Sequence, residues 1–327
     1  MKKTYTLALA LVAALSWCAV GCQHKAPDAG RLEVQPRSVV LPYPQLATVR
    51  LSWTPAASAG GEDSPSAPLV FLHLLGPKGQ VLRTFDHPFP QHWVAGTPVS
   101  YDVKLYQSAL APALDPGRYR LTVGLYDQGG RRWTLEGLGE PIGRQEYMAA
   151  EVQVPAQPQP AGPRLEFSPA WLPLAAGSDK QVVARRWLAD QPGEIRVQSI
   201  PGPGTLWLSF RIPPGDGPTD KLVYHDATAN TPSVVVRGTC GAVETGISGP
   251  GPHDIDMPIE AAGPDGVCRI SLAPNFHILS PGQPAIRSVS LESAAYSPGA
   301  ARGAAPGSAP EPPGSPAGAV APPPRTP

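Results

Sequence analysis

Prolines recur at short intervals along most of this chain, and that spacing leaves little room for long helices. The 327 residues include 44 prolines and 34 glycines. A chain divided in this way can build short strands joined by turns. The sequence therefore predicts an all-β protein made of antiparallel sheets.

The first residues have the features of an export signal. Lys2 and Lys3 precede the apolar run Thr6 to Leu15, which is too short for a permanent membrane span. The following Ala19-Val20-Gly21-Cys22 resembles the lipobox of bacterial lipoproteins, although Ala19 stands where Leu is more usual. The resemblance implies cleavage before Cys22 and acylation of that cysteine. The alternative is an ordinary secretory signal in which Cys22 is incidental.

The lipobox resemblance also implies a location. Gln23 follows the cysteine, and it is not the Asp that retains enterobacterial lipoproteins at the inner membrane. We therefore expect lipid anchoring to the bacterial outer membrane, with the periplasmic face of the inner membrane as the alternative. No later apolar run is long enough to span a bilayer, so the N-terminal lipid would be the only membrane contact.

Composition divides the remaining chain into two strand-forming blocks. We expect a signal peptide over 1–21 and a polar tether over 22–30. The rest of the chain divides by composition into four segments. These are a first domain (31–154), a proline-rich linker (155–163), a second domain (164–296) and a disordered Pro/Ala/Gly tail (297–327).

Alternating apolar residues predict the strands of the first block. Ala47 to Trp53 places Val49 and Leu51 on one face, and Arg118 to Asp127 alternates in the same way. Pro77-Lys78-Gly79 predicts a hairpin turn into Gln80 to Phe85. About seven short strands at this spacing favour an antiparallel sandwich.

Two sets of residues in the first block resemble known domains. Leu114-Asp-Pro-Gly-Arg-Tyr119 resembles the turn and tyrosine at the corner of many immunoglobulin-like sandwiches. The wider pattern, from Phe71-Leu-His-Leu-Leu75 to Val123-Gly-Leu-Tyr-Asp127, is similar to immunoglobulin-like domains of bacterial extracytoplasmic proteins, including tails of some membrane glycosyltransferases. The resemblance implies an immunoglobulin-like fold and brings no catalytic residues.

The second block resembles a jelly-roll sandwich through Phe167-Ser-Pro-Ala-Trp171 and Arg186-Trp187-Leu188. Many such domains bind carbohydrate. We expect Trp171 and Trp187 to form a partly exposed pair on which a ligand could stack, and Trp93 is a further candidate. The alternative is that most of the tryptophans are core residues.

Cysteines and acidic residues give the remaining candidates. Cys240 and Cys268 are an even pair in an exported chain, which favours a disulfide over two buried thiols. Asp254 and Asp256 alternate on one strand face, so both could join a structural calcium site, or they could simply be solvated. Beyond this unsupported calcium, no cofactor is expected.

The loop from Asp86 to Trp93 gathers an acid with His87 and His92. Such a group could bind a metal or exchange protons, but the prolines within the loop favour a simple exposed connection.

Charge and missing motifs narrow the function. Twenty-six basic residues balance 26 acidic ones, which gives no electrostatic reason to expect nucleic acid as a partner. Known nucleophile, metalloprotease, phosphate-loop and dinucleotide motifs are lacking in the sequence. We expect a non-catalytic binding or scaffolding role at the cell envelope, with glycan or an envelope protein as the partner. The alternatives are an enzyme that processes envelope polysaccharide and an accessory partner of a membrane glycosyltransferase or secretion assembly.

Overall fold

The described residues of the computed structural model form an all-β molecule, as the sequence predicts. Within them there is no helix of any kind, and hence none that is long and apolar enough to cross a membrane. The signal peptide, Cys22 and most of the tail lie outside the described residues. Described are residues 28–56, 68–127, 129–156, 162–174, 185–214, 221–241, 243–260, 265–281 and 286–299.

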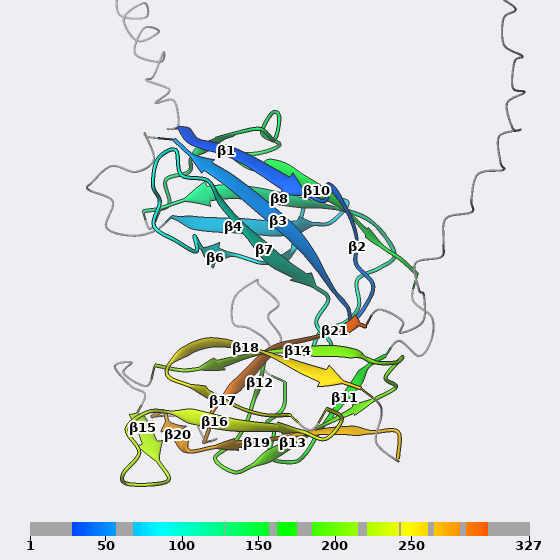
Figure 1. The fold of residues 1–327 in the computed structure, drawn as a ribbon, viewed down its shortest axis with the longest axis vertical. Helices are drawn as coiled ribbons and strands as arrows, with labels where there is room; N and C mark the ends of the chain where they lie inside the picture. The colour runs from blue at the N-terminus through cyan, green and yellow to red at the C-terminus, as the bar shows by residue number, and fades with distance from the viewer. Residues whose placement is uncertain are drawn as a thin grey trace, which may run out of the picture.

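The strands fall into two units that follow each other in the chain (Figure 1). The first unit contains β1 (Asp28–Gln35), β2 (Ser38–Val40), β3 (Leu46–Pro55), β4 (Leu69–Leu75), β5 (Val81–Thr84), β6 (His87–Pro88), β7 (Val99–Tyr106), β8 (Gly117–Tyr126), β9 (Thr134–Glu136) and β10 (Tyr147–Val154). The second unit contains β11 (Arg164–Phe167), β12 (Arg186–Trp187), β13 (Gly193–Gln198), β14 (Gly204–Ile212), β15 (Lys221–Tyr224), β16 (Ser233–Gly238), β17 (Val243–Ser248), β18 (Gly251–Ile259), β19 (Cys268–Pro274), β20 (Phe276–Leu279) and β21 (Ser290–Pro298).

Two sheets enclose the core of the first unit. One sheet has the order β7-β3-β1-β9, and the other has the order β2-β10-β8-β4-β5 with β6 beside β4. Alternate side chains such as Leu51, Leu72 and Leu121 are fully buried between them. Most pairs are antiparallel, but β1 with β9 and β2 with β10 are short parallel pairs.

Two turns of the first unit behave as the sequence predicts. Gly79 takes a φ of +78° at the predicted hairpin between β4 and β5, where a side chain would be strained. The Tyr119 hydroxyl donates a hydrogen bond to the Asp115 carbonyl at 2.6 Å, as expected of a tyrosine at a sandwich corner. These contacts fit the immunoglobulin-like resemblance, which itself stays a prediction.

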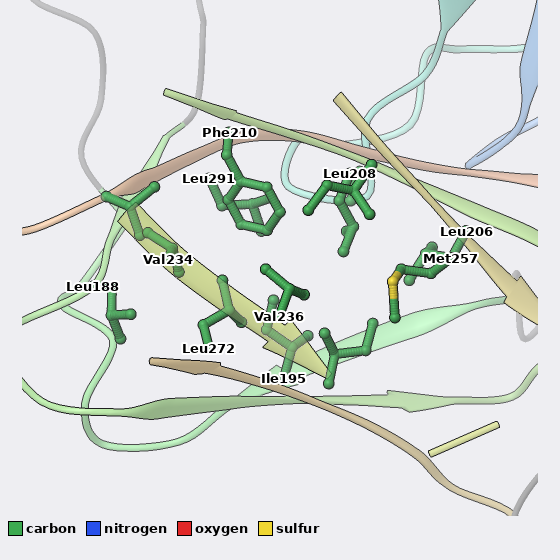
Figure 2. Close-up of a cluster of buried hydrophobic side chains, with 14 of the residues drawn as sticks. Leu188, Ile195, Leu206, Leu208, Phe210, Val234, Val236, Met257, Leu272 and Leu291 are labelled. Carbon is green, nitrogen blue, oxygen red and sulfur yellow. The ribbon is translucent and has the colours of Figure 1, made fainter. Parts of the chain in front are cut away.

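The second unit repeats the two-layer plan with a separate core. The sheet β12-β21-β14-β18 faces the sheet β11-β13-β19-β16-β17, and β15 pairs with β20 alone. Figure 2 shows Leu208 and Phe210 from β14 meeting Val234 and Val236 from β16 across this core. The jelly-roll type stays a prediction.

Two predicted boundaries need correction. The tether was expected to reach residue 30, but β1 begins at Asp28 because Asp28 and Gly30 pair with β9 and β3. The tail was expected to begin at Ser297, but β21 runs to Pro298 because its last residues pair with Thr205 and Gly204.

The predicted disulfide between Cys240 and Cys268 is present. Cys240 follows the end of β16, and Cys268 starts the neighbouring strand β19, so the bridge continues the ladder between the two strands. Their Cα atoms are 5.4 Å apart, within the range that a disulfide can join.

The two units make direct contact where β3 and β7 meet β14 and β21. The Tyr296 amide donates to the Pro44 carbonyl at 2.8 Å, and the Ala109 amide donates to the Ala294 carbonyl at 2.7 Å. Leu110, which follows β7, packs into the core of the second unit. Backbone hydrogen bonds and a shared core residue therefore join the units in addition to the linker.

Candidate functional site: a polar hollow beside the junction of the two units

Three neighbouring strands of the first unit place polar side chains in one row. In the registers of β1, β3 and β7, Gln35 lies opposite Arg50, and Arg50 lies opposite Asp102. All three are exposed, because the residues that alternate with them face the core. Thr48 on β3 continues this polar face toward the second unit.

These residues line an open hollow of about 550 Å³. Its walls are Gln35, Pro36, Thr48, Arg50 and Asp102. The hollow is shallow and open to solvent, so a ligand would lie across it rather than be enclosed. An amide, a hydroxyl, a guanidinium and a carboxylate thus lie side by side on one open surface and offer both donors and acceptors of hydrogen bonds.

Arg50 and Asp102 form a bidentate pair along one wall of the hollow. Arg50 Nε lies 2.8 Å from Asp102 Oδ1, and Nη2 lies 3.1 Å from Oδ2. The hydrogen bond from Arg50 holds the pKa of the Asp102 carboxyl below its usual value. Their side chains remain 60% and 49% exposed, so the unused hydrogen-bonding positions face solvent.

Two residues beyond Asp102 on β7, the side chain of Lys104 reaches across the junction to the second unit. Lys104 Nζ lies 3.4 Å from Asp256 Oδ1 and 4.0 Å from Asp254 Oδ2. The same ammonium lies 5.3 Å from the centroid of the Trp207 ring, and Tyr106 contacts that ring at a centroid distance of 4.7 Å. Trp207 is only 4% exposed because the first unit covers the outward face of β14.

The two aspartates on β18 therefore have a cationic neighbour. Asp254 and Asp256 share the outward face of the strand, as the alternation predicts. That face meets Lys104, and among the described residues no group of three or more His, Cys, Asp or Glu could hold a metal ion. An ammonium beside both carboxylates gives the calcium hypothesis no support, because calcium would need further oxygen ligands there.

The expected tryptophan pair is wrong in one member. Trp171 is 4% exposed and packs in the second core, with its ring 5.5 Å from that of Phe167. A side chain on Gly193 would collide with Leu188 and press on Trp171, which shows how tightly this ring is enclosed. Trp171 therefore offers no stacking face. It is a core residue, which was the alternative interpretation of the tryptophans.

The other two tryptophans stay candidates, at separate places. Trp187 is half-buried beneath the Arg287 guanidinium, 4.8 Å from its ring centroid. Trp93 is half-buried against Phe89 and Trp53, at centroid distances of 4.6 and 6.0 Å. They belong to different units, so the structure gathers no aromatic platform from the predicted residues.

The loop cluster around Asp86 is dispersed by the fold. Asp86 lies 3.3 Å from His73 on β4, and Glu146 lies 3.9 Å from the same imidazole. His87 instead contacts Tyr101, and His92 is exposed. The predicted group of Asp86, His87 and His92 therefore does not form, and Asp86 instead shares the His73 imidazole with Glu146.

Sequence reasoning missed the hollow. Alternation in Ala47 to Trp53 did place Arg50 away from the core, which was the available signal. The partner Asp102 follows 52 residues later, and Gln35 comes from a third strand. Only the registers of β1, β3 and β7 bring them together.

Comparisons with known proteins add little. A search of protein families finds no match for this chain, and no curated protein matches it. Among solved structures, the secreted serine protease VesC from Vibrio cholerae shows a TM-score of 0.24 and 9% identity. The match covers 82% of this chain and 51% of the protease chain, so this chain spans about half of that protein.

Proposed function

We propose that this chain is a lipid-anchored binding protein of the bacterial cell envelope that holds glycan in the polar hollow of its first unit. The observation that carries the proposal is the row formed by Gln35, Arg50 and Asp102 beside Thr48. The Gln35 amide can bond two neighbouring hydroxyls, which is what a sugar ring presents, and the hydrogen-bonding positions that Arg50 and Asp102 do not use on each other can bond further hydroxyls.

The pairing of charged side chains in and beside the hollow favours a ligand that has no net charge. Arg50 is paired with Asp102, and Lys104 is paired with Asp254 and Asp256. Neither cation is left free to bind an acidic group alone. A neutral polyhydroxylated ligand fits these self-neutralised side chains better than a phosphate or a sulfate does.

The openness of the row supports a binding role over catalysis. A general acid or base needs a titratable group directed at the reacting bond, with its pKa near the working pH. In the hollow the carboxylate of Asp102 is held ionised by Arg50, and no nucleophile–base pair lines the space. The lining residues can therefore orient hydroxyls, which suits retention of a polysaccharide.

The test is retention by envelope polysaccharide in affinity electrophoresis. We expect Arg50→Ala and Asp102→Ala each to weaken retention about tenfold, since each removes a charged group that would bond sugar hydroxyls and leaves its former partner unpaired. Arg237→Ala is the matched control, because Arg237 and Glu244 form a similar exposed bidentate pair in the second unit. Equal retention of wild type, Arg50→Ala and Asp102→Ala would contradict the proposal.

The anchor is tested separately. Cys22→Ser should leave the chain soluble or unprocessed, because the acyl chains would have no attachment site. Membrane fractionation with metabolic labelling by palmitate measures both outcomes. A Cys22→Ser chain that is processed normally and stays in the membrane fraction contradicts lipid anchoring through this residue.

A further inference from the structure

Two histidines lie together on the two-stranded antiparallel sheet formed by β15 and β20, which are far apart in the sequence. Tyr224 pairs with Phe276, and Val223 pairs with His277. The His225 amide donates to the Asn275 carbonyl at 2.9 Å, which continues the ladder by one residue. His225 and His277 are therefore diagonal neighbours on one face of this strand pair. Their ring centroids are 5.5 Å apart, and the planes differ by 33°.

Neither imidazole has a polar partner within the described part of the chain. Nδ1 of His277 is buried without a hydrogen bond. Asp226, the acid adjacent to His225, instead accepts from the backbone amide and hydroxyl of Thr228, both at 2.8 Å. A buried ring nitrogen without a partner costs free energy, which calls for an explanation.

His73 also has a buried Nδ1 without a hydrogen bond, but its imidazole lies beside Asp86 and Glu146, whereas two further histidines bond neutral protein groups. His87 bonds the Phe85 carbonyl and the Tyr101 hydroxyl, and His253 bonds the Gly249 carbonyl. Their rings are held by protein groups. The rings of His225 and His277 have each other as neighbours, and their nitrogens bond no protein group in the described part of the chain.

We propose that His225 and His277 form a two-imidazole site for a divalent transition-metal ion, Cu²⁺ or Zn²⁺. An ion about 2.0 Å from one nitrogen of each ring, in tetrahedral geometry, places the ring centroids about 5 Å apart. The observed 5.5 Å matches that requirement with small side-chain rotations. Water completes the coordination, because no third protein ligand is present among the described residues.

The choice of metal follows from ligand chemistry. Imidazole nitrogen suits Cu²⁺, Ni²⁺ and Zn²⁺, whereas Ca²⁺ and Mg²⁺ prefer oxygen. Cu²⁺ binds a given nitrogen site more tightly than Zn²⁺, so the same pair should take both ions in that order. The β15–β20 pair lies at the end of the second unit away from the first unit (Figure 1), so this site is independent of the polar hollow.

The test is calorimetric titration of the full chain, without a histidine tag, with Cu²⁺ and then with Zn²⁺. The chain carries other imidazoles and thiols, so the informative quantity is the difference between variants. We expect His225→Ala and His277→Ala each to bind one ion fewer, or to bind it at least tenfold more weakly. His92→Ala is the control, because His92 is exposed and lies in the first unit.

Two further readouts keep the outcome clear. His225 is exposed, so its replacement by alanine should leave the fold intact even if His277→Ala does not. Metal should raise the Tm of wild type and not that of His225→Ala. Cu²⁺ at the site should show coupling to two nitrogens in its electron paramagnetic resonance spectrum. Isotherms that are unchanged in both variants, or an equal loss in His92→Ala, would overturn the proposal.

Discussion

His87 shows how one residue can set a pH dependence in this molecule. Its Nδ1 donates to the Phe85 carbonyl at 2.8 Å, and its Nε2 lies 2.8 Å from the Tyr101 hydroxyl. Because a carbonyl can only accept, the ring proton is on Nδ1 and Tyr101 donates to Nε2. Burial lowers the pKa of His87 and raises the pKa of Tyr101, so both groups are neutral at pH 7.

This neutral histidine predicts a loss of stability in acid. A base whose pKa is lower in the folded state binds more protons when unfolded, so the free energy of unfolding falls as pH drops below about 6.5. Between about pH 7.5 and about pH 5.5, wild type should lose more stability than His87→Gln, which cannot titrate. Urea unfolding at both pH values measures this, and equal losses would contradict it.

At the scale of elements, the disulfide joins strands that already pair. Cys240 and Cys268 are 28 residues apart in the sequence, and Cys268 is buried in the second core. The bridge therefore closes a loop that contains β17 and β18, and it limits how far the unfolded chain can spread.

Removal of the disulfide should lower the stability of the fold, by an amount that rises slowly with the length of that loop. We expect the double variant Cys240→Ala/Cys268→Ala to lose roughly 3 kcal/mol in its free energy of unfolding, on the loop-entropy argument. Denaturant unfolding of oxidised wild type against the double variant measures the loss. Reduced wild type is the control and should resemble the variant, whereas a loss near zero would show that the loop is restrained without the bridge.

Alternation predicted the strands well, and tertiary contacts decided the rest. Val49 and Leu51 face the core as expected, and Arg50 faces outward. The sequence could not show that Arg50 meets Asp102, because the register between β3 and β7 depends on how two sheets pack. Trp171 lies in a short irregular segment without a periodic pattern, so its burial could not be predicted from its neighbours.

At the scale of the whole molecule, Trp207 shows why contacts between domains are hard to predict from the alternation of apolar residues. Its neighbours Leu206 and Leu208 face the core of the second unit, so Trp207 faces outward. It is nevertheless buried, because Tyr106 and Lys104 of the first unit cover it. An outward-facing apolar residue on a strand thus marked a contact with a neighbouring domain.

Because hydrogen bonds and buried side chains join the two units at the junction, we expect them to unfold together. Trp207→Ala removes a large buried ring from the contact, so it should divide one calorimetric transition into two. Trp187→Ala is the control, since Trp187 lies beneath Arg287 rather than against the first unit. Differential scanning calorimetry makes the comparison. Two separate transitions already present in wild type would show that the junction couples the units weakly.

The place of β21 determines when these contacts can form during synthesis. This strand is the last one described, yet it lies inside its sheet between β12 and β14 and hydrogen-bonds to the first unit near Pro44. A chain emerging from its N-terminus can complete the first unit as soon as β10 is available. The second core and the junction cannot form before residues 290–298 have been synthesised. Until then the sheet that carries Trp207 is incomplete, and Trp207 cannot be held against the first unit.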